Sequence, residues 1–425
     1  MSVPEKRPRP QSSAEIPSLT ESDRLAEVQR KQQWIANFLK SFQIDALLLQ
    51  KRHNFAWFTC GAENGSDACA AGKAAVFVTP EARVIVTDNV TSPLLFEREL
   101  AGLGFQLKER SWREGHRGLI EELCHGRQVG GDVPHANRKD YSDALAGFRR
   151  CLTTEEAIRM RELGRDVAHA VEATARRLVR GSTEAAIAGE VAHRLIKRQV
   201  VPCRLQVAGD YRRVRFRTQN FTQTPVNQFC TLTATGRRDG LHITVSRTVC
   251  FGEPPKDLVE SYQAAVQIQA TGICFSRENW TLHDAWQRVA RIYEKTGHPN
   301  EWEYAAQGAI VGYRDPEVPI VIGPVDENVS LQQGMAIVWH PSIGPATLAD
   351  TLLITPNGGE LLTPMENWPR VRVRVRSTAI SRPGILRRQN ADQPESKETA
   401  IDPAAQDSFA WLSDDRTGLG GLFSE

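Results

Sequence analysis

The sequence predicts an α/β (α+β) protein of two domains: a small α/β domain, then a larger domain with an internal pseudo-two-fold duplication. The length of 425 residues accommodates two domains of ~100–200 residues each. Helix-like and strand-like segments alternate over residues 20–150, whereas residues 151–390 twice follow the order helix pair, then strands. Residues 1–19 carry charge and proline without an apolar run and predict a disordered leader. Residues 391–425, in which acidic residues outnumber basic ones and Pro and Ser occur, predict a flexible tail.

The predicted first domain opens with a helix, because apolar side chains recur at helical spacing over residues 21–42. Short apolar runs between polar or glycine-containing segments then predict strands over residues 44–50, 74–79 and 82–88. Residues 119–133 predict a helix followed by a strand. This alternation indicates an α/β domain that ends near residue 150.

The predicted second domain begins with a capping box, in which Thr153 precedes Glu156 by one helical turn. Apolar spacing and turn residues define the elements that follow. Helices are expected over residues 154–178, 184–198, 256–274 and 282–296, and strands over residues 203–209, 228–252, 309–313, 334–341 and 350–356.

Arginine and valine alternate over residues 370–376, which predicts a strand with one basic face. We interpret this segment as a final strand with a solvated edge, because clustered positive charge discourages edge pairing. A surface for an acidic partner is the alternative.

The charge balance argues against two classes of partner. The chain has 53 Lys and Arg against 51 Asp and Glu, a net charge of +2, so it predicts no binding to nucleic acid or to a membrane surface. No apolar run approaches the ~18–20 residues that span a bilayer. The cysteines are scattered without a CxxC pair, which is typical of thiols in a reducing compartment, and a cytoplasmic location is expected.

Three ordered motifs lie in the second domain. The first is the predicted hairpin, which contains Thr233, the turn Asp239-Gly240, Thr244, Ser246-Arg247-Thr248 and Phe251-Gly252. The second contains Glu301-Trp302, Gln307-Gly308, Gly312-Tyr313 and Glu317, and the third contains Trp339-His340-Pro341-Ser342 and Asp350-Thr351.

In this order the motifs resemble those of the creatinase and aminopeptidase P family, which implies its pita-bread fold. The resemblance aligns the five metal-ligand positions of the family's peptidases with Thr233, Thr244, Gln307, His340 and Ala349. Two divalent ions require hard, anionic donors, which these neutral side chains do not supply. The resemblance therefore implies a metal-free, degenerate branch, with no metal and no other cofactor.

The chain departs from that metal-free branch as well, at Ala305, Ala306, Thr218 and Ala349. These positions resemble sites where the branch carries histidines and a glutamate. The loss of several candidate bases and carboxylates weakens a direct inheritance of the branch's chemistry.

Three side chains are candidates for catalysis. His242 lies two residues from Thr244, so on a strand both share a face, and His340 occupies a former ligand position. Either histidine could act as a general base near neutral pH, or be a satisfied core histidine. Glu317 could orient a histidine or bind a cationic substrate.

Five further side chains are candidates for substrate binding. Arg215 and Arg217 are expected on one strand face and could clamp a carboxylate, the alternative being a solvated basic strand. Gln307 and Tyr313 are candidate polar contacts. Asp350 could bind a cationic substrate or accept a hydrogen bond at the end of a strand.

These residues favour a metal-independent hydrolase that cleaves a C–N bond of a small, amino-acid-derived substrate. Two alternatives remain open: a pseudoenzyme that binds a small molecule or a protein partner without catalysis, and a conventional metal-dependent aminopeptidase if the motifs align differently. The resemblance also implies a homodimer, in which the first domain of one subunit closes the cleft of the other.

Overall fold

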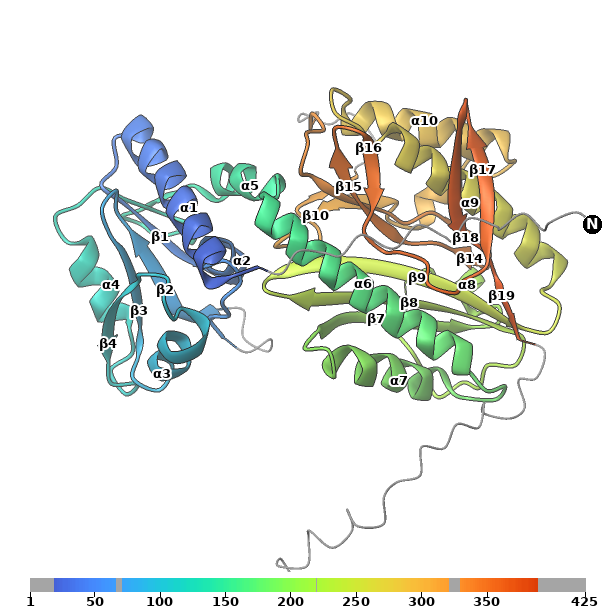
Figure 1. The fold of residues 1–425 in the computed structure, drawn as a ribbon, viewed down its shortest axis with the longest axis horizontal. Helices are drawn as coiled ribbons and strands as arrows, with labels where there is room; N and C mark the ends of the chain where they lie inside the picture. Colours follow the sequence, from blue (N-terminus) through green and yellow to red (C-terminus); the bar gives the residue numbers. More distant parts are fainter. Residues whose placement is uncertain (1–18, 66–70, 219, 321–328, 389–425) are drawn as a thin grey trace, which may run out of the picture.

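The computed structural model describes residues 19–65, 71–218, 220–320 and 329–388. Nearly all of the predicted leader and the whole predicted acidic tail lie outside these residues. Figure 1 shows a smaller body, which holds α1 to α4, beside a larger body, with α5 and the start of α6 between them.

The smaller body is a mixed six-stranded sheet with helices packed against it, in the strand order β4-β3-β2-β1-β5-β6. Its strands are β1 (Ala46–Lys51), β2 (Ala71–Val78), β3 (Arg83–Asp88), β4 (Gln106–Arg110), β5 (Val129–Gly131) and β6 (Lys139–Asp140). Its helices are α1 (Glu21–Phe42), α2 (Arg52–Phe58), α3 (Ser92–Leu94), the π-helical η1 (Leu95–Glu99), α4 (Arg117–Cys124) and α5 (Ser142–Arg150).

The predicted helix over residues 21–42 is confirmed with both of its ends. Thr20 caps α1, because its hydroxyl accepts the backbone N–H of Asp23 while the Asp23 carboxylate accepts that of Thr20. The apolar side of α1, including Val28 and Ile35, lies in one core cluster with Leu47 and Leu49 of β1. The helical spacing of the sequence therefore corresponds to the face that covers the sheet.

The larger body contains two sheets that face each other, each with a helix pair on its outer side. The first half holds α6 (Thr154–Arg177), α7 (Glu184–Ile196), β7 (Val201–Gly209), α8 (Arg212–Arg215), β8 (Phe229–Arg238) and β9 (Leu241–Phe251). The second half holds α9 (Lys256–Phe275), α10 (Leu282–Lys295), the 3₁₀-helical η2 (Glu301–Tyr304), β10 (Gly308–Val311), β11 (Val318–Pro319), β12 (Ala336–Trp339), β13 (Ser342–Ile343), β14 (Ala346–Thr347), β15 (Asp350–Thr355) and β16 (Gly358–Leu361).

The two halves repeat the order helix pair, then strands, which confirms the predicted fold class. The first sheet has the strand order β19-β9-β8-β7 and the second the order β11-β10-β12-β15-β16. In β8 and β9 the apolar residues, such as Leu232 and Ile243, lie in the core with α6 and α7. The alternate residues are mostly Thr and Ser, and they face the second sheet: the backbone N–H of Thr244 donates to the Thr351 hydroxyl (3.1 Å). Because side chains alternate along each strand, the first sheet has an apolar outer face that packs against the helices and a polar inner face that lies toward the second sheet.

Two local predictions are wrong. The Arg/Val segment is not the final strand, because β17 (Arg370–Val375) forms a two-stranded ribbon with β18 (Thr378–Pro383), and β19 (Leu386–Arg388) then pairs with β9. The segment that carries Arg215 is a helical turn rather than a strand. Arg213 lies in this turn and is buried, whereas Arg217 lies two residues beyond its end.

A buried charge network joins the two bodies. The Lys31 ammonium of α1 donates to Glu27 (2.6 Å), to the Trp57 carbonyl (2.6 Å) and to Glu156 of α6 (2.6 Å). Arg159 donates to Glu27 as well (2.9 Å). Both carboxylates and the ammonium are fully buried, so each charge depends on the others for compensation.

The turn between β8 and β9 touches the smaller body. Asp239 and Gly240 both have positive φ (51° and 75°), as a two-residue hairpin turn of this hand requires. A Cβ on Gly240 would lie 2.6 Å from the Ala56 Cβ and 2.9 Å from the Tyr313 ring. Glycine is therefore needed there for the backbone conformation and for the close approach of α2.

Candidate functional site

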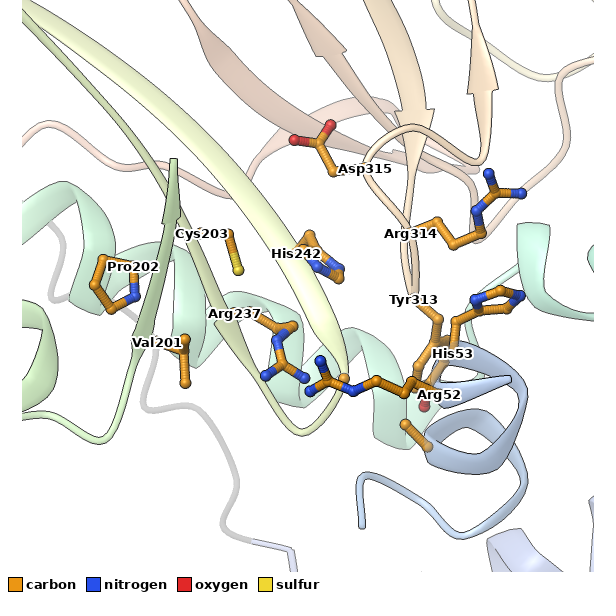
Figure 2. A pocket seen from close by; sticks show the side chains of 12 residues that line it. Arg52, His53, Val201, Pro202, Cys203, Arg237, His242, Tyr313, Arg314 and Asp315 are labelled. Atoms are coloured by element: carbon orange, nitrogen blue, oxygen red, sulfur yellow. The ribbon is translucent and has the colours of Figure 1, made fainter. Parts of the chain in front are cut away.

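A pocket of about 490 Å³ lies where α2, the ends of β7 to β9 and the loop after β10 meet. Figure 2 shows Arg52 and His53 entering it from α2, Arg237 and His242 from the hairpin, and Arg314 and Asp315 from the loop. The remaining walls are formed by Ala56, Val201, Pro202, Cys203, Gly240 and Tyr313. We call this space the outer pocket.

The two histidines of the outer pocket are both held neutral. Burial is the main cause that lowers the pKa of His242, although the nearby Gly312 carbonyl and the Asp315 charge act in the opposite direction. Burial and the positive charges of Arg149 and Arg314 lower the pKa of His53 to about 3. His242 Nδ1 lies 3.2 Å from the Gly312 carbonyl oxygen, which selects the tautomer with the proton on Nδ1. Its Nε2 atom then carries the lone pair of a general base.

Positive charge dominates the lining of the outer pocket. Arg52 and Arg237 share the carboxylate of Glu63, at 2.9 Å and 2.5 Å. Asp315 accepts a hydrogen bond from Arg204 (3.0 Å). Arg314 is exposed, and its charge acts on His53. The pocket is therefore suited to an anionic or dipolar ligand.

A second polar group lies deeper, between the two sheets. Thr233 is opposite Ser246 in the β8–β9 ladder. Ser246 exchanges hydrogen bonds with Ala349: its hydroxyl accepts the Ala349 N–H (2.5 Å), and its own N–H donates to the Ala349 carbonyl (2.8 Å). Trp339 is opposite Asp350 in the β12–β15 ladder, so His340 follows beside Ala349. We call Thr233, Ser246, His340 and Ala349 the inner cluster.

The structure thus brings together three of the five positions that resemble metal ligands, Thr233, His340 and Ala349. Thr244 lies in the next row of the same sheet, where its hydroxyl is 2.8 Å from that of Thr235. Gln307 differs, because its amide accepts from Tyr293 (2.5 Å) and donates to the carbonyls of Trp302 (3.2 Å) and Ala305 (2.7 Å). Its functional atoms are fixed on the side of α10.

Three other predicted site residues are held in buried contacts. Arg149 donates to both carboxylate oxygens of Glu317, at 3.2 Å and 3.0 Å. Tyr313 donates its hydroxyl proton to Glu156 (2.8 Å), within the charge network between the bodies. Asp350 lies between the guanidinium groups of Arg247 (2.9 Å) and Arg382. These contacts leave His242 and His340 as the predicted catalytic residues with a ring nitrogen available.

The two predicted clamp arginines lie apart from both sites. Arg215 is exposed, with its guanidinium 5.2 Å from the Phe216 ring centroid. Arg217 donates to Glu301 (2.6 Å), to Ser342 (3.1 Å) and to the Gly344 carbonyl (2.9 Å). The sequence reasoning did not single out His53 or Arg314 as site residues; Arg314 directly follows Tyr313 of the second motif, which was the available signal.

The residues of the inner cluster do not fit a two-metal centre. Thr, Ser and Ala supply no anionic donor, and His340 supplies one imidazole, whereas two divalent ions need several hard oxygen ligands. Burial, together with the charges of Arg213 and Arg204, lowers the pKa of His340 to about 3, so the surroundings are already electropositive. Within the part of the chain that the structure describes, no three His, Cys, Asp or Glu side chains are grouped to hold a metal ion.

The comparisons with known proteins agree with this architecture. The model of metallopeptidase family M24 matches residues 158–359. The chain carries a domain of this family. The prolidase of Pyrococcus horikoshii superposes with a TM-score of 0.66 at 18% identity, covering 79% of this chain and 99% of that one. The X-Pro aminopeptidase of Thermotoga maritima superposes with a TM-score of 0.65 at 14% identity, covering 79% of this chain and 98% of that one. The predicted creatinase and aminopeptidase P fold is confirmed.

Curated relatives match this chain over a shorter length. The Xaa-Pro dipeptidase of Pyrococcus horikoshii is 28% identical over 127 residues, which is 29% of this chain and 35% of the relative. That of Lactobacillus delbrueckii is 22% identical over 239 residues, 55% of this chain and 64% of the relative. The matches thus span about a third to two thirds of the relatives' length.

Two observations concern the surroundings of the chain. None of the helices in the described segments is long and apolar enough to cross a bilayer. None of the cysteines in those segments forms a disulfide. The cytoplasmic location and the homodimer stay predictions.

Proposed function

We propose that this M24 chain is a metal-independent hydrolase that cleaves a C–N bond of a small, amino-acid-derived substrate in the outer pocket. The observation that carries the proposal is His242, a neutral imidazole with Nδ1 anchored on a backbone carbonyl and Nε2 directed to a cationic pocket. The similarity to proteins named Xaa-Pro dipeptidase supports a peptidase-like hydrolase.

His242 would supply both proton transfers. Its Nε2 takes a proton from water, the water oxygen attacks the carbon of the scissile bond, and the resulting imidazolium returns the proton to the leaving nitrogen. The Arg314 guanidinium is placed to hold an acidic group of the substrate at the mouth of the pocket. No step of this reaction requires a bound metal.

The test is a turnover screen of the purified protein with creatine-like, ectoine-like and prolyl-dipeptide compounds, with and without chelator. We expect hydrolysis that survives chelation, is lost in His242→Gln, and persists in His125→Gln, a control at an exposed position. Unfolding midpoints verify that both variants fold. Absence of turnover on all three classes, or unchanged turnover in His242→Gln, would refute the proposal. Binding of about two manganese ions per chain would instead favour the conventional metal-dependent aminopeptidase.

A pseudoenzyme is the second candidate. One observation favours it: the polar groups of four candidate site residues are already engaged in hydrogen bonds to other side chains of the protein. These residues are Glu317, Tyr313, Asp350 and Gln307. Saturable binding of a small molecule without turnover, and with His242→Gln binding as well as the parent protein, would favour this candidate over hydrolysis.

A further inference from the structure

The inner cluster contains buried polar atoms without partners, and the proposed hydrolysis does not use them. Among the described residues, Thr233 Oγ1, His340 Nε2 and the Nε and Nη1 atoms of Arg213 are buried without a hydrogen-bond partner. Buried polar groups of native proteins are nearly always paired, so orphans that gather in one place need an explanation.

Arg213 is the most demanding of these groups. Its side chain lies in the turn of α8, only 2% of its surface is exposed, and burial together with the charge of Arg217 lowers its pKa to about 10. It therefore stays cationic at neutral pH while its Nε and Nη1 lack acceptors. A buried charge without a counter-ion is strongly unfavourable, so a bound anion would stabilise Arg213.

Two observations place Arg213 near His340. Its charge lowers the pKa of the His340 imidazole, as does that of Arg204. Two residues after the end of α8, Arg217 bonds to Ser342 and to the Gly344 carbonyl, which holds this end of α8 beside the segment that follows His340. Arg213 is therefore expected at the edge of the inner cluster.

The same register places Thr233 in the floor of the inner cluster. It is opposite Ser246, which bonds to Ala349 beside His340. Ala349 is smaller than the glutamate that its position resembles in the peptidases of the family.

We infer that the inner cluster binds an oxyanion, the carboxylate of a small organic acid or a phosphate, held by Arg213, the Thr233 hydroxyl and His340 Nε2. The guanidinium of Arg213 supplies charge-assisted N–H donors to such a group from Nε and Nη1, which lie on different edges of the fork. The hydroxyl adds a third donor, and His340 a fourth in the tautomer with the proton on Nε2. A cation is disfavoured by the positive charge that Arg213 and Arg204 already impose on His340.

Comparison with structural arginines of the chain supports a ligand role. Arg247 and Arg382 are as deeply buried as Arg213, and both donate to Asp350. Arg149 likewise has Glu317. A buried arginine with a purely structural role is expected to contact a carboxylate in the same way.

The inference goes beyond the proposed function, and its test measures binding rather than turnover, so each can fail without the other. Acetate, glycine and inorganic phosphate are titrated against the full chain by calorimetry and by thermal unfolding, with Arg213→Met and Arg215→Met as the matched pair. Arg215 lies in the same turn, exposed, and provides the control.

We expect saturable binding and a raised Tm for at least one oxyanion in the parent and in Arg215→Met, weakened about 10- to 100-fold in Arg213→Met. Without ligand, Arg213→Met should unfold at a higher temperature than the parent, because the uncompensated charge is gone. Preference for acetate and glycine assigns a carboxylate, and preference for phosphate assigns a phosphate.

Three outcomes would overturn the inference: no saturable effect of any of the three oxyanions, equal binding by Arg213→Met, or a ligand-free Arg213→Met that is less stable than the parent. If Arg213→Met does not fold, the last of these outcomes is met. Thr233→Val is the second variant, and it should weaken binding without lowering the ligand-free Tm.

Discussion

The network between the two bodies and the inner cluster are both buried and both carry charge, yet they differ in compensation. Every charge of the network faces an opposite one: Lys31 contacts Glu27 and Glu156, and Arg159 contacts Glu27. Beside and within the inner cluster, Arg213 Nε and Nη1 and His340 Nε2 have no hydrogen-bond partner among the described residues. Glu27 Oε2 and Arg159 Nε of the network lack one as well, but both groups are ion-paired, whereas Arg213 forms no ion pair with a described residue. Ion pairing therefore separates the groups that hold the fold from those that await a partner.

The largest effect is expected at the paired region. Lys31→Met leaves Glu27 and Glu156 buried without their shared cation, and it should lower the free energy of unfolding by ~3–5 kcal/mol. Urea denaturation measures this change. Lys40→Met, at an exposed position at the end of the same helix, should change it by less than ~0.5 kcal/mol. Similar losses in the two variants would contradict the distinction drawn above.

The hairpin turn next to the network offers a test with two matched glycines. Gly240 and Gly181 have similar φ values of 75° and 84°, but a Cβ on Gly181 meets nothing within 4 Å. Alanine at Gly181 should cost ~1 kcal/mol through backbone strain alone. Alanine at Gly240 should cost ~1–3 kcal/mol more, because it also collides with α2. Equal thermal shifts for the two variants would show that the turn is not packed against the smaller body.

Acidification should lower the stability through two neutral histidines, His53 of the outer pocket and His340 of the inner cluster. The pKa of His53 and of His340 is about 3 in the folded chain, against roughly 6.5 when unfolded. Between these values the unfolded state binds more protons, so stability is retained above pH 6.5 and falls as the pH drops toward 3.

At pH 5 each of these two histidines should account for a loss on the order of 1–2 kcal/mol. His340→Gln and His53→Gln should each flatten the decline in urea midpoints between pH 6.5 and 5, whereas the exposed His125→Gln should leave it unchanged. A decline that is identical in all three variants would assign the pH dependence to other groups.

The smallest change in stability is expected for two threonine hydroxyls on the same strand face, one with and one without a hydrogen-bond partner. Thr231 contacts the Thr248 hydroxyl (3.0 Å), whereas Thr233 Oγ1 has no partner among the described residues. Valine at Thr231 should cost ~1 kcal/mol, while valine at Thr233 should be neutral or slightly stabilising. Chemical denaturation of both variants would sharpen the comparison, and a larger loss at Thr233 would assign that hydroxyl a structural partner.

Much of the fold could be read from local patterns. The helix over residues 21–42 and the capping box at Thr153 appear as expected, because apolar spacing and caps act within a few residues of the chain. The prediction failed near Arg215, where alternating residues suggested a strand and the chain forms a helical turn. It failed again at the Arg/Val segment, which pairs with a later strand. Strand pairing and short turns depend on distant partners, which a single sequence does not display.

The sequence by itself determined the fold class, because this follows from the order of elements and motifs along the chain, and it predicts neutral residues at the positions that resemble the family's metal ligands. Only the tertiary structure decided which polar groups are engaged in structural contacts. It pairs Glu317 with Arg149 and Tyr313 with Glu156, while it leaves His242 facing a pocket and gives Arg213 Nε and Nη1 no hydrogen-bond partner among the described residues. The physical reason is that hydrogen-bond satisfaction depends on side chains brought together from remote segments, and the chain order does not specify which of them will meet.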